Sequence, residues 1–89
     1  MTMKNALTTS QPFDTVDGVA LFSVNAGVPI EAALERAADL MLYVETLATA
    51  DAFINKAHES GVIQQLSQMA SALVRASQLS VRELLGARM

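Results

Sequence analysis

The fold is decided by the stretch GVPIEAALERAADLMLYVETLA, residues 27–48. Pro29 stands where the first turn of a helix tolerates a residue without an N–H, and Glu31 suits the positive end of the helix dipole. Beyond them, apolar residues recur every three or four positions, which is the period of an α-helix. They are Ile30, Ala33, Leu34, Ala37, Leu40, Met41, Val44, Leu47 and Ala48. The stretch therefore predicts an amphipathic helix with one apolar face.

The position where this helix ends is open to two interpretations. No proline or glycine lies between Ala50 and His58, which favours continuation to about His58. The apolar phase shifts near residues 49–51, however, so a break there is the alternative. Gly61 follows Ser60 and is typical of the left-handed residue after a helix, so we expect the turn at this point. A continuous helix through Gly61 is the competing model.

A second amphipathic run follows this expected turn. Its apolar residues are Val62, Ile63, Leu66, Met69, Ala70, Leu73, Val74, Ala76, Val81 and Leu84. The segment Ser80–Glu83 has the form of a capping box, but an uninterrupted helix is favoured over a new one. The two runs predict an antiparallel hairpin in which position n lies near roughly position 121 − n. That register would place Glu45 close to Arg75 and Arg36 close to Glu83.

Upstream of the helices, residues 19–24, VALFSV, read as a short strand bounded by turn residues. Residues 1–18 are expected to form a disordered tail, or alternatively to carry a linear motif around Phe13. A lone strand leaves its backbone groups unpaired, so residues 19–24 either pair with a second copy or form an arm on the helices. The expected fold is thus all-α, with a tail over 1–18 and one helical-hairpin domain over 19–89.

Composition limits the classes of function. The chain is 52% apolar, has a net charge of −3 and contains no cysteine. It can therefore form a core, but it has neither disulfides nor thiolate metal ligands. The acidic balance argues against a nucleic-acid or anionic-membrane partner. The longest apolar run, Leu40–Val44, is far below the ~20 residues of a membrane span, and no secretory signal is evident, so we expect a cytoplasmic protein.

Candidate chemistry is sparse. His58 is the single histidine and lacks a second ligand at metal-binding spacing. Glu31, Glu35 and Asp39 form an acidic ridge that is more typical of a solvated helix face than of a catalytic or cation site. No nucleophile elbow and no phosphate-binding glycine loop is present. The sequence therefore predicts no enzyme activity, no catalytic residue, no metal and no cofactor.

The wide apolar face of the second helix indicates self-association, because one antiparallel neighbour covers only a narrow seam. We expect a homodimer that forms a four-helix bundle. The candidate interface residues are Leu21, Phe22, Leu34, Met41, Val44, Leu66, Met69 and Leu73. The function that fits best is a small interaction or adaptor protein with an unidentified protein partner. The alternative is an antitoxin-like or transcription-associated regulator, against which the acidic balance counts.

Two segments also resemble a known family. The first is residues 21–40, a hydrophobic strand followed by Gly-Val-Pro and a Glu-x-Ala-Leu-x-x-Ala-x-x-Leu helix. The second is the stretch from Leu66 to Val74. Together they resemble a family of short bacterial proteins catalogued only as a domain of unknown function, over roughly residues 20–85. These motifs are structural, so the resemblance implies a soluble bacterial protein and no active site.

Overall fold

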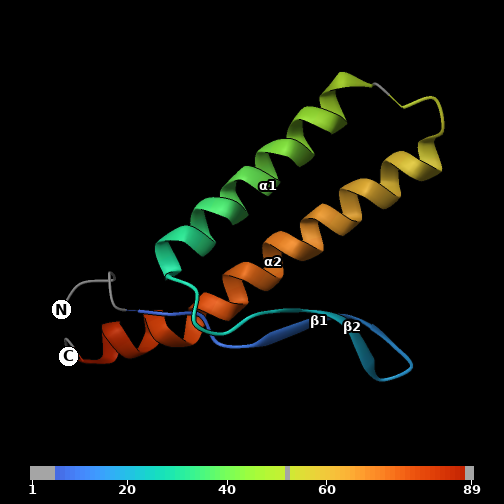
Figure 1. The fold of residues 1–89 in the computed structure, drawn as a ribbon. Coiled ribbons are helices and arrows are strands. Elements are labelled where there is room, and N and C mark those ends of the chain that lie inside the picture. Colours follow the sequence, from blue (N-terminus) through green and yellow to red (C-terminus); the bar gives the residue numbers. More distant parts are fainter. Residues whose placement is uncertain (1–5, 52, 88–89) are drawn as a thin grey trace.

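The computed structural model describes residues 6–51 and 53–87, with only the backbone described at residues 79, 80, 83, 84 and 87. Within these ranges the chain forms β1 (Gln11–Val16), β2 (Val19–Val24), α1 (Ile30–Ala50) and α2 (Lys56–Ala87). Figure 1 shows a helical hairpin preceded by a β-hairpin that runs beside α2. The expected helical hairpin is confirmed, and a two-stranded ribbon is added to it.

The ribbon corrects the prediction of an N-terminal tail. β1 pairs antiparallel with β2 in a regular register that includes Phe13 opposite Phe22. Asp17 and Gly18 form the two-residue connection and both have positive φ, 49° and 80°. Such a turn matches the natural twist of two antiparallel strands. The partner of β2 is therefore β1 of the same chain, instead of a second copy or the helices.

Thr8 joins the segment before β1 to the segment after β2 by hydrogen bonds. Its hydroxyl donates to the Asn25 carbonyl at 2.8 Å and accepts from the Val28 N–H at 3.0 Å. Its own N–H donates to the Val28 carbonyl at 2.8 Å, and its side chain is buried. The neighbouring Thr9 N–H donates to the Ala76 carbonyl of α2 at 2.8 Å. These bonds explain why residues 6–10 are held in place instead of forming a tail; residues 1–5 of the expected tail lie outside the described residues.

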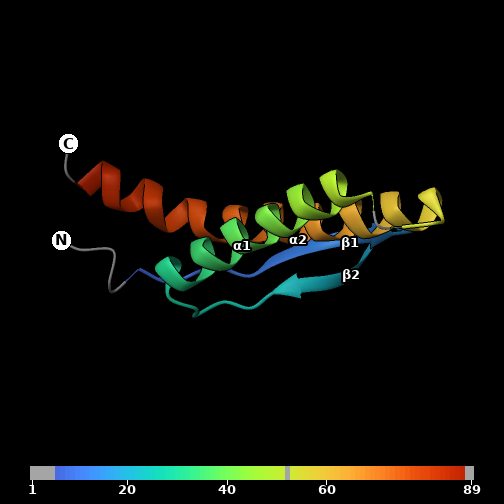
Figure 2. The same ribbon diagram turned by 90° about the horizontal axis from the view of Figure 1, so that it is seen from above.

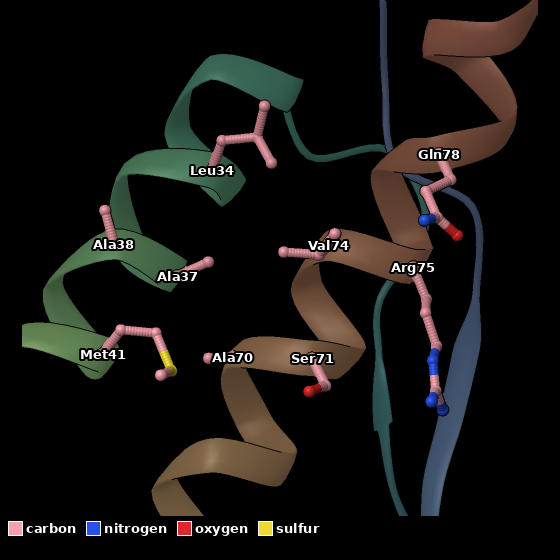
Figure 3. Close-up of a pocket in the computed structure, with 9 residues that line it drawn as sticks. All are labelled: Leu34, Ala37, Ala38, Met41, Ala70, Ser71, Val74, Arg75 and Gln78. Carbon is pink, nitrogen blue, oxygen red and sulfur yellow. The ribbon is translucent and has the colours of Figure 1, made fainter. Parts of the chain in front are cut away.

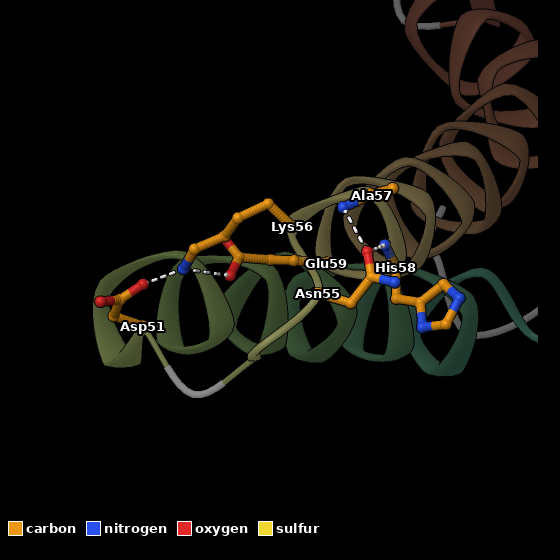
Figure 4. Close-up of polar contacts among 6 residues, drawn as sticks. All are labelled: Asp51, Asn55, Lys56, Ala57, His58 and Glu59. Atoms are coloured by element: carbon orange, nitrogen blue, oxygen red, sulfur yellow. Dashed lines mark hydrogen bonds and ion pairs between the residues drawn. The ribbon is translucent and has the colours of Figure 1, made fainter.

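The turn between the helices lies earlier than expected (Figure 4). α1 ends at Ala50, followed by Asp51 in the left-handed conformation, with φ 50°. The side-chain oxygen of Asn55 accepts the Ala57 N–H at 2.9 Å and the His58 N–H at 3.3 Å, which caps the start of α2. Continuation of the first helix to His58 was thus wrong, and the break at residues 49–51 was right. Gly61 lies within α2, where it costs only about 1 kcal/mol.

This earlier turn changes the register of the hairpin. Leu40 would have faced Val81 under the expected register, but it packs instead with Ala37 and Ala70 in the core. Leu66 and Leu73 complete this cluster from α2. The expected pair of Glu45 with Arg75 is therefore not formed.

Among the described side chains, the ion pairs join Lys56 to Asp51 and to Glu59, at the new turn. The expected pair of Arg36 with Glu83 involves a side chain outside the described ones. The uninterrupted course of α2 through residue 80 is confirmed.

The elements form a thin molecule. Figure 2 shows the helices in one layer, with β1 between α2 and β2, and β2 at the outer side. The overall extents are 50 × 32 × 19 Å. The described core is built largely from small residues, because Ala33, Ala37, Ala70, Ala72 and Ala76 are all buried. Close packing of alanines brings the helices together but leaves most of their surfaces uncovered.

Candidate interaction surfaces

A groove runs along the hairpin between α1 and α2 (Figure 3). Its volume is about 480 Å³. Its lining residues come from both helices at helical spacing: Leu34, Ala37, Ala38, Met41, Ala70, Ser71, Val74, Arg75 and Gln78. Met41 and Val74 are 46% and 40% exposed. The small side chains of Ala38 and Ser71 leave the groove open between these larger ones, so apolar surface faces the solvent along both helices.

A second hollow lies between β1 and α2. It is lined by residues 12–15 of β1 and by Gln64, Ser67, Gln68, Ser71 and Arg75 of α2. Ser71 and Arg75 border both hollows, and Figure 3 shows the Arg75 side chain extending beside β1. The buried Gln68 Oε1 accepts no hydrogen bond from the described residues. This second hollow is therefore more polar than the groove between the helices.

The ribbon forms a third surface. The rings of Phe13 and Phe22 stack with their centroids 5.7 Å apart, which fixes one face of the ribbon. Leu21 points to the other face, because neighbouring residues of a strand alternate, and it is 58% exposed. Val16 and Val19 flank the turn and are also exposed. Apolar side chains are thus presented on both faces of the ribbon.

Comparison with models of protein families identifies the family to which the chain belongs. The model of a family described as "Protein of unknown function (DUF3077)" matches residues 8–80. The chain belongs to the DUF3077 family. The matched range begins at the buried Thr8 and includes the ribbon, α1 and most of α2. No curated protein and no solved structure matches the chain.

The expected resemblance to a family catalogued only as a domain of unknown function is thereby confirmed as membership of DUF3077. The expected interface residues of this DUF3077 chain separate into groups. Leu66 and Leu73 pack against the core between α1 and α2 of one chain, and Val44 is partly buried. Leu34 and Met41 line the groove, whereas Leu21 and Phe22 lie exposed on the ribbon.

Met69 is the remaining member of that set and is partly exposed on α2. Val74 is the largest apolar residue among the groove residues that the sequence-based set omitted. Its signal was present, since it follows Ala70 by one helical turn on the same apolar run. The helical spacing of apolar residues identifies such positions. It does not show which of them lie on the side of α2 that packs against α1 and which lie on the side that stays exposed.

The polar candidates of this DUF3077 chain line neither the groove nor the second hollow. Glu31, Glu35 and Asp39 are exposed on α1, and His58 is exposed in the first turn of α2. The described residues include no cluster of three or more histidine or acidic side chains that could hold a metal ion. Hydrogen bonds to Asp51 and then to Glu59 raise the pKa of Lys56 above 10.5, which keeps its ammonium charged at the turn. The described helices include none long and apolar enough to cross a membrane.

Proposed function

We propose that the chain is a small non-enzymatic interaction protein that acts as a homodimer, with two hairpins packed groove to groove as a four-helix bundle. The observation that carries this proposal is the open apolar groove between α1 and α2, in which Met41 and Val74 remain exposed. Burying such side chains against a second hairpin stabilises association by about 1 kcal/mol or more each. The groove matches a surface of its own kind, because a two-fold axis brings identical faces together.

The size of the chain supports this arrangement. Its accessible surface is 6270 Å², against about 5,000 Å² expected for a compact monomer of 9.5 kDa. A standard interface removes about 800 Å² from each partner. The excess surface of the single chain is therefore large enough to supply one side of a stable dimer.

The charges beside the groove favour one orientation of the two hairpins. Glu31 is exposed near the start of α1, and Arg75 borders the same end of the groove from α2. A two-fold axis parallel to the helices places α1 against α2 of the second copy, so Glu31 meets Arg75 of that copy. An axis perpendicular to the helices places α1 on α1 and brings acidic side chains together. Complementary charges mainly select the orientation and contribute little affinity.

The groove also supports the non-enzymatic part of the proposal. Arg75 is the single charged residue among its described lining residues, and the others are apolar, Ser71 or Gln78. Acid–base catalysis needs a group that gains or loses a proton near the working pH, and an arginine stays protonated. The lining instead resembles the apolar centre and polar rim of a protein interface.

The proposal is tested by the molar mass in solution. Light scattering should give a dimer for the wild type and a monomer for Met41→Asp and for Val74→Asp, since each buries a charge in the interface. Tyr43→Asp is the matched control, because Tyr43 is 50% exposed on α1 and does not line the groove. It should remain dimeric. A monomeric wild type, or a Met41→Asp variant that stays dimeric, would contradict the proposal.

A further inference from the structure

We propose that the outer edge of β2 is a docking site for an extended, uncharged segment of another protein, which adds to the ribbon as a third strand. This site is separate from the groove and from the homodimer. β2 consists of Val19–Val24, with the sequence VALFSV, and contains no charged residue and no proline. In the described chain the sheet contains β1 and β2 alone, so β2 is an edge strand. Figure 2 shows no element beyond it.

The direction of the backbone groups follows from the turn. In a hairpin closed by two residues, the flanking pair Val16 and Val19 bond to each other across the ribbon. Successive residues then alternate, so Ala20 and Phe22 direct their N–H and C=O groups to the outer edge. No hydrogen bond found outside the sheet among the described residues reaches these groups. The edge therefore offers a row of donors and acceptors at strand spacing.

The two edges of the ribbon are protected unequally. β1 lies between β2 and α2, so its outer edge faces the helix, and Asp14, whose φ is 58°, interrupts its extended backbone. Prolines, charges and irregular residues are the devices by which edge strands avoid pairing with other chains. β2 has none of these along its length. This difference within one ribbon indicates that the β2 edge is left available for pairing.

The chemistry of the edge specifies the occupant. Only an extended backbone can satisfy a row of N–H and C=O groups at this spacing, which excludes a helix. Leu21 and Phe22 are exposed on opposite faces, so apolar side chains of the incoming strand find apolar neighbours on either face. Because β2 is uncharged, a charged segment would gain no ionic partner there. The occupant is thus an uncharged segment rich in β-branched or aromatic residues.

A second copy fits this edge less well than a segment of another protein. With the homodimer proposed above, a second self-pairing surface on the same chain would produce open-ended assemblies. An extended segment from another protein adds one strand and leaves the assembly closed.

The test uses the full chain and a defined probe, a capped Thr-Val-Thr-Val-Thr-Val peptide. Binding is followed by NMR, through the amide exchange rates of Ala20 and Phe22, which should fall when the peptide is added. A peptide with a central proline should bind at least about tenfold more weakly, because it loses a donor and cannot lie flat on the edge.

The matched protein variants are Ala20→Pro and Ala20→Ser. Ala20→Pro removes an outward N–H and should weaken binding of the peptide by about tenfold or more, whereas Ala20→Ser keeps that N–H and should bind as the wild type does. The Phe13–Phe22 ring-current shifts report that the ribbon is intact in each variant. If Ala20→Pro loses these shifts, Phe22→Lys, which sets a charge on the edge, takes its place, with Phe22→Leu as control. In these two variants, slow exchange of the inward-facing Val19 amide reports that the ribbon is intact.

The outcomes distinguish this inference from the proposed homodimer. Loss of peptide binding in the edge variant, with an unchanged molar mass, supports the inference whether the chain is a monomer or a dimer. Failure of the peptide to bind, or equal binding to both Ala20 variants, would overturn it. So would a molar mass that falls in Ala20→Pro but not in Ala20→Ser, because the occupant would then be a second copy.

Discussion

Single polar residues and glycines set the boundaries of this fold. Asp17 and Gly18 reverse the ribbon with positive φ angles, Asp51 ends α1 in the same region of conformation, and Asn55 caps α2. Asp and Asn enter this region more readily than other residues, because their short side chains bond to the nearby backbone. Gly61, which looks like the stronger stop signal in the sequence, is simply part of α2.

The same substitution at two glycines should therefore have opposite effects. Gly18→Ala should lower the free energy of unfolding by about 1 kcal/mol, since an alanine is strained at φ 80°. Gly61→Ala should raise it by about 0.5–1 kcal/mol, because alanine is the better helix former and the space around Gly61 is open. Urea denaturation at equal protein concentration measures both. A destabilised Gly61→Ala would show that α2 does not continue through this position.

The helices are held by a short core of mostly small residues. Leu40 is the one leucine of α1 that is buried among the described residues, and it packs on Ala70. Leu66 and Leu73 next to it are only partly buried, because the neighbouring side chains are mostly alanines and cover little of each leucine. α1 therefore depends on few large contacts, and its opposite face remains exposed at Leu42 and Tyr43.

Two leucines of α1 should consequently differ in their contribution to stability. Leu40→Ala should lower the free energy of unfolding by about 2–3 kcal/mol, through lost burial and the cavity it leaves. Leu42→Ala removes the same atoms from the same helix, but Leu42 is 56% exposed, and its effect should stay within about 0.5 kcal/mol. Thermal or urea unfolding gives the comparison. Equal losses at both sites would contradict the orientation of α1.

At the scale of the whole molecule, the chain is too extended for a compact globule. Its Cα radius of gyration is 15.4 Å, whereas about 12 Å is expected for a compact chain of this length. α2 is longer than α1, and Figure 1 shows its last turns continuing past the start of α1. Both features leave surface uncovered, which is the physical basis for expecting partners.

This shape can be measured on a monomer. X-ray scattering from Met41→Asp, made monomeric at the groove, should give a radius of gyration near 15 Å, as the elongated hairpin and its ribbon require. A value close to about 12 Å would show that the free chain folds back into a compact form. Tyr43→Asp serves again as the control and should give the larger radius of a dimer.

The sequence alone determined the two helices, the strand at residues 19–24 and the membership of a family of unknown function. Helical period and the position of Pro29 are local signals, so the segment that forms α1 could be predicted well up to Ala50. The Asp17–Gly18 pair was also a local signal, typical of a tight hairpin turn, and it would have identified β1 as the partner of β2.

Only the tertiary structure decided the turn after α1, the register of the hairpin and the separation of the apolar residues into core and surface. The choice between Asp51 and Gly61 depends on which register packs Leu40 against Ala70, and that packing is not visible in either helix alone. Apolar residues on both sides of a wide apolar stripe recur with the same helical period, so the sequence does not distinguish one side from the other. The three-dimensional arrangement settles which side of the stripe α1 covers, which side the ribbon covers and which side stays exposed. Val74 and Met41 are exposed because the side chains next to them are too small to cover them.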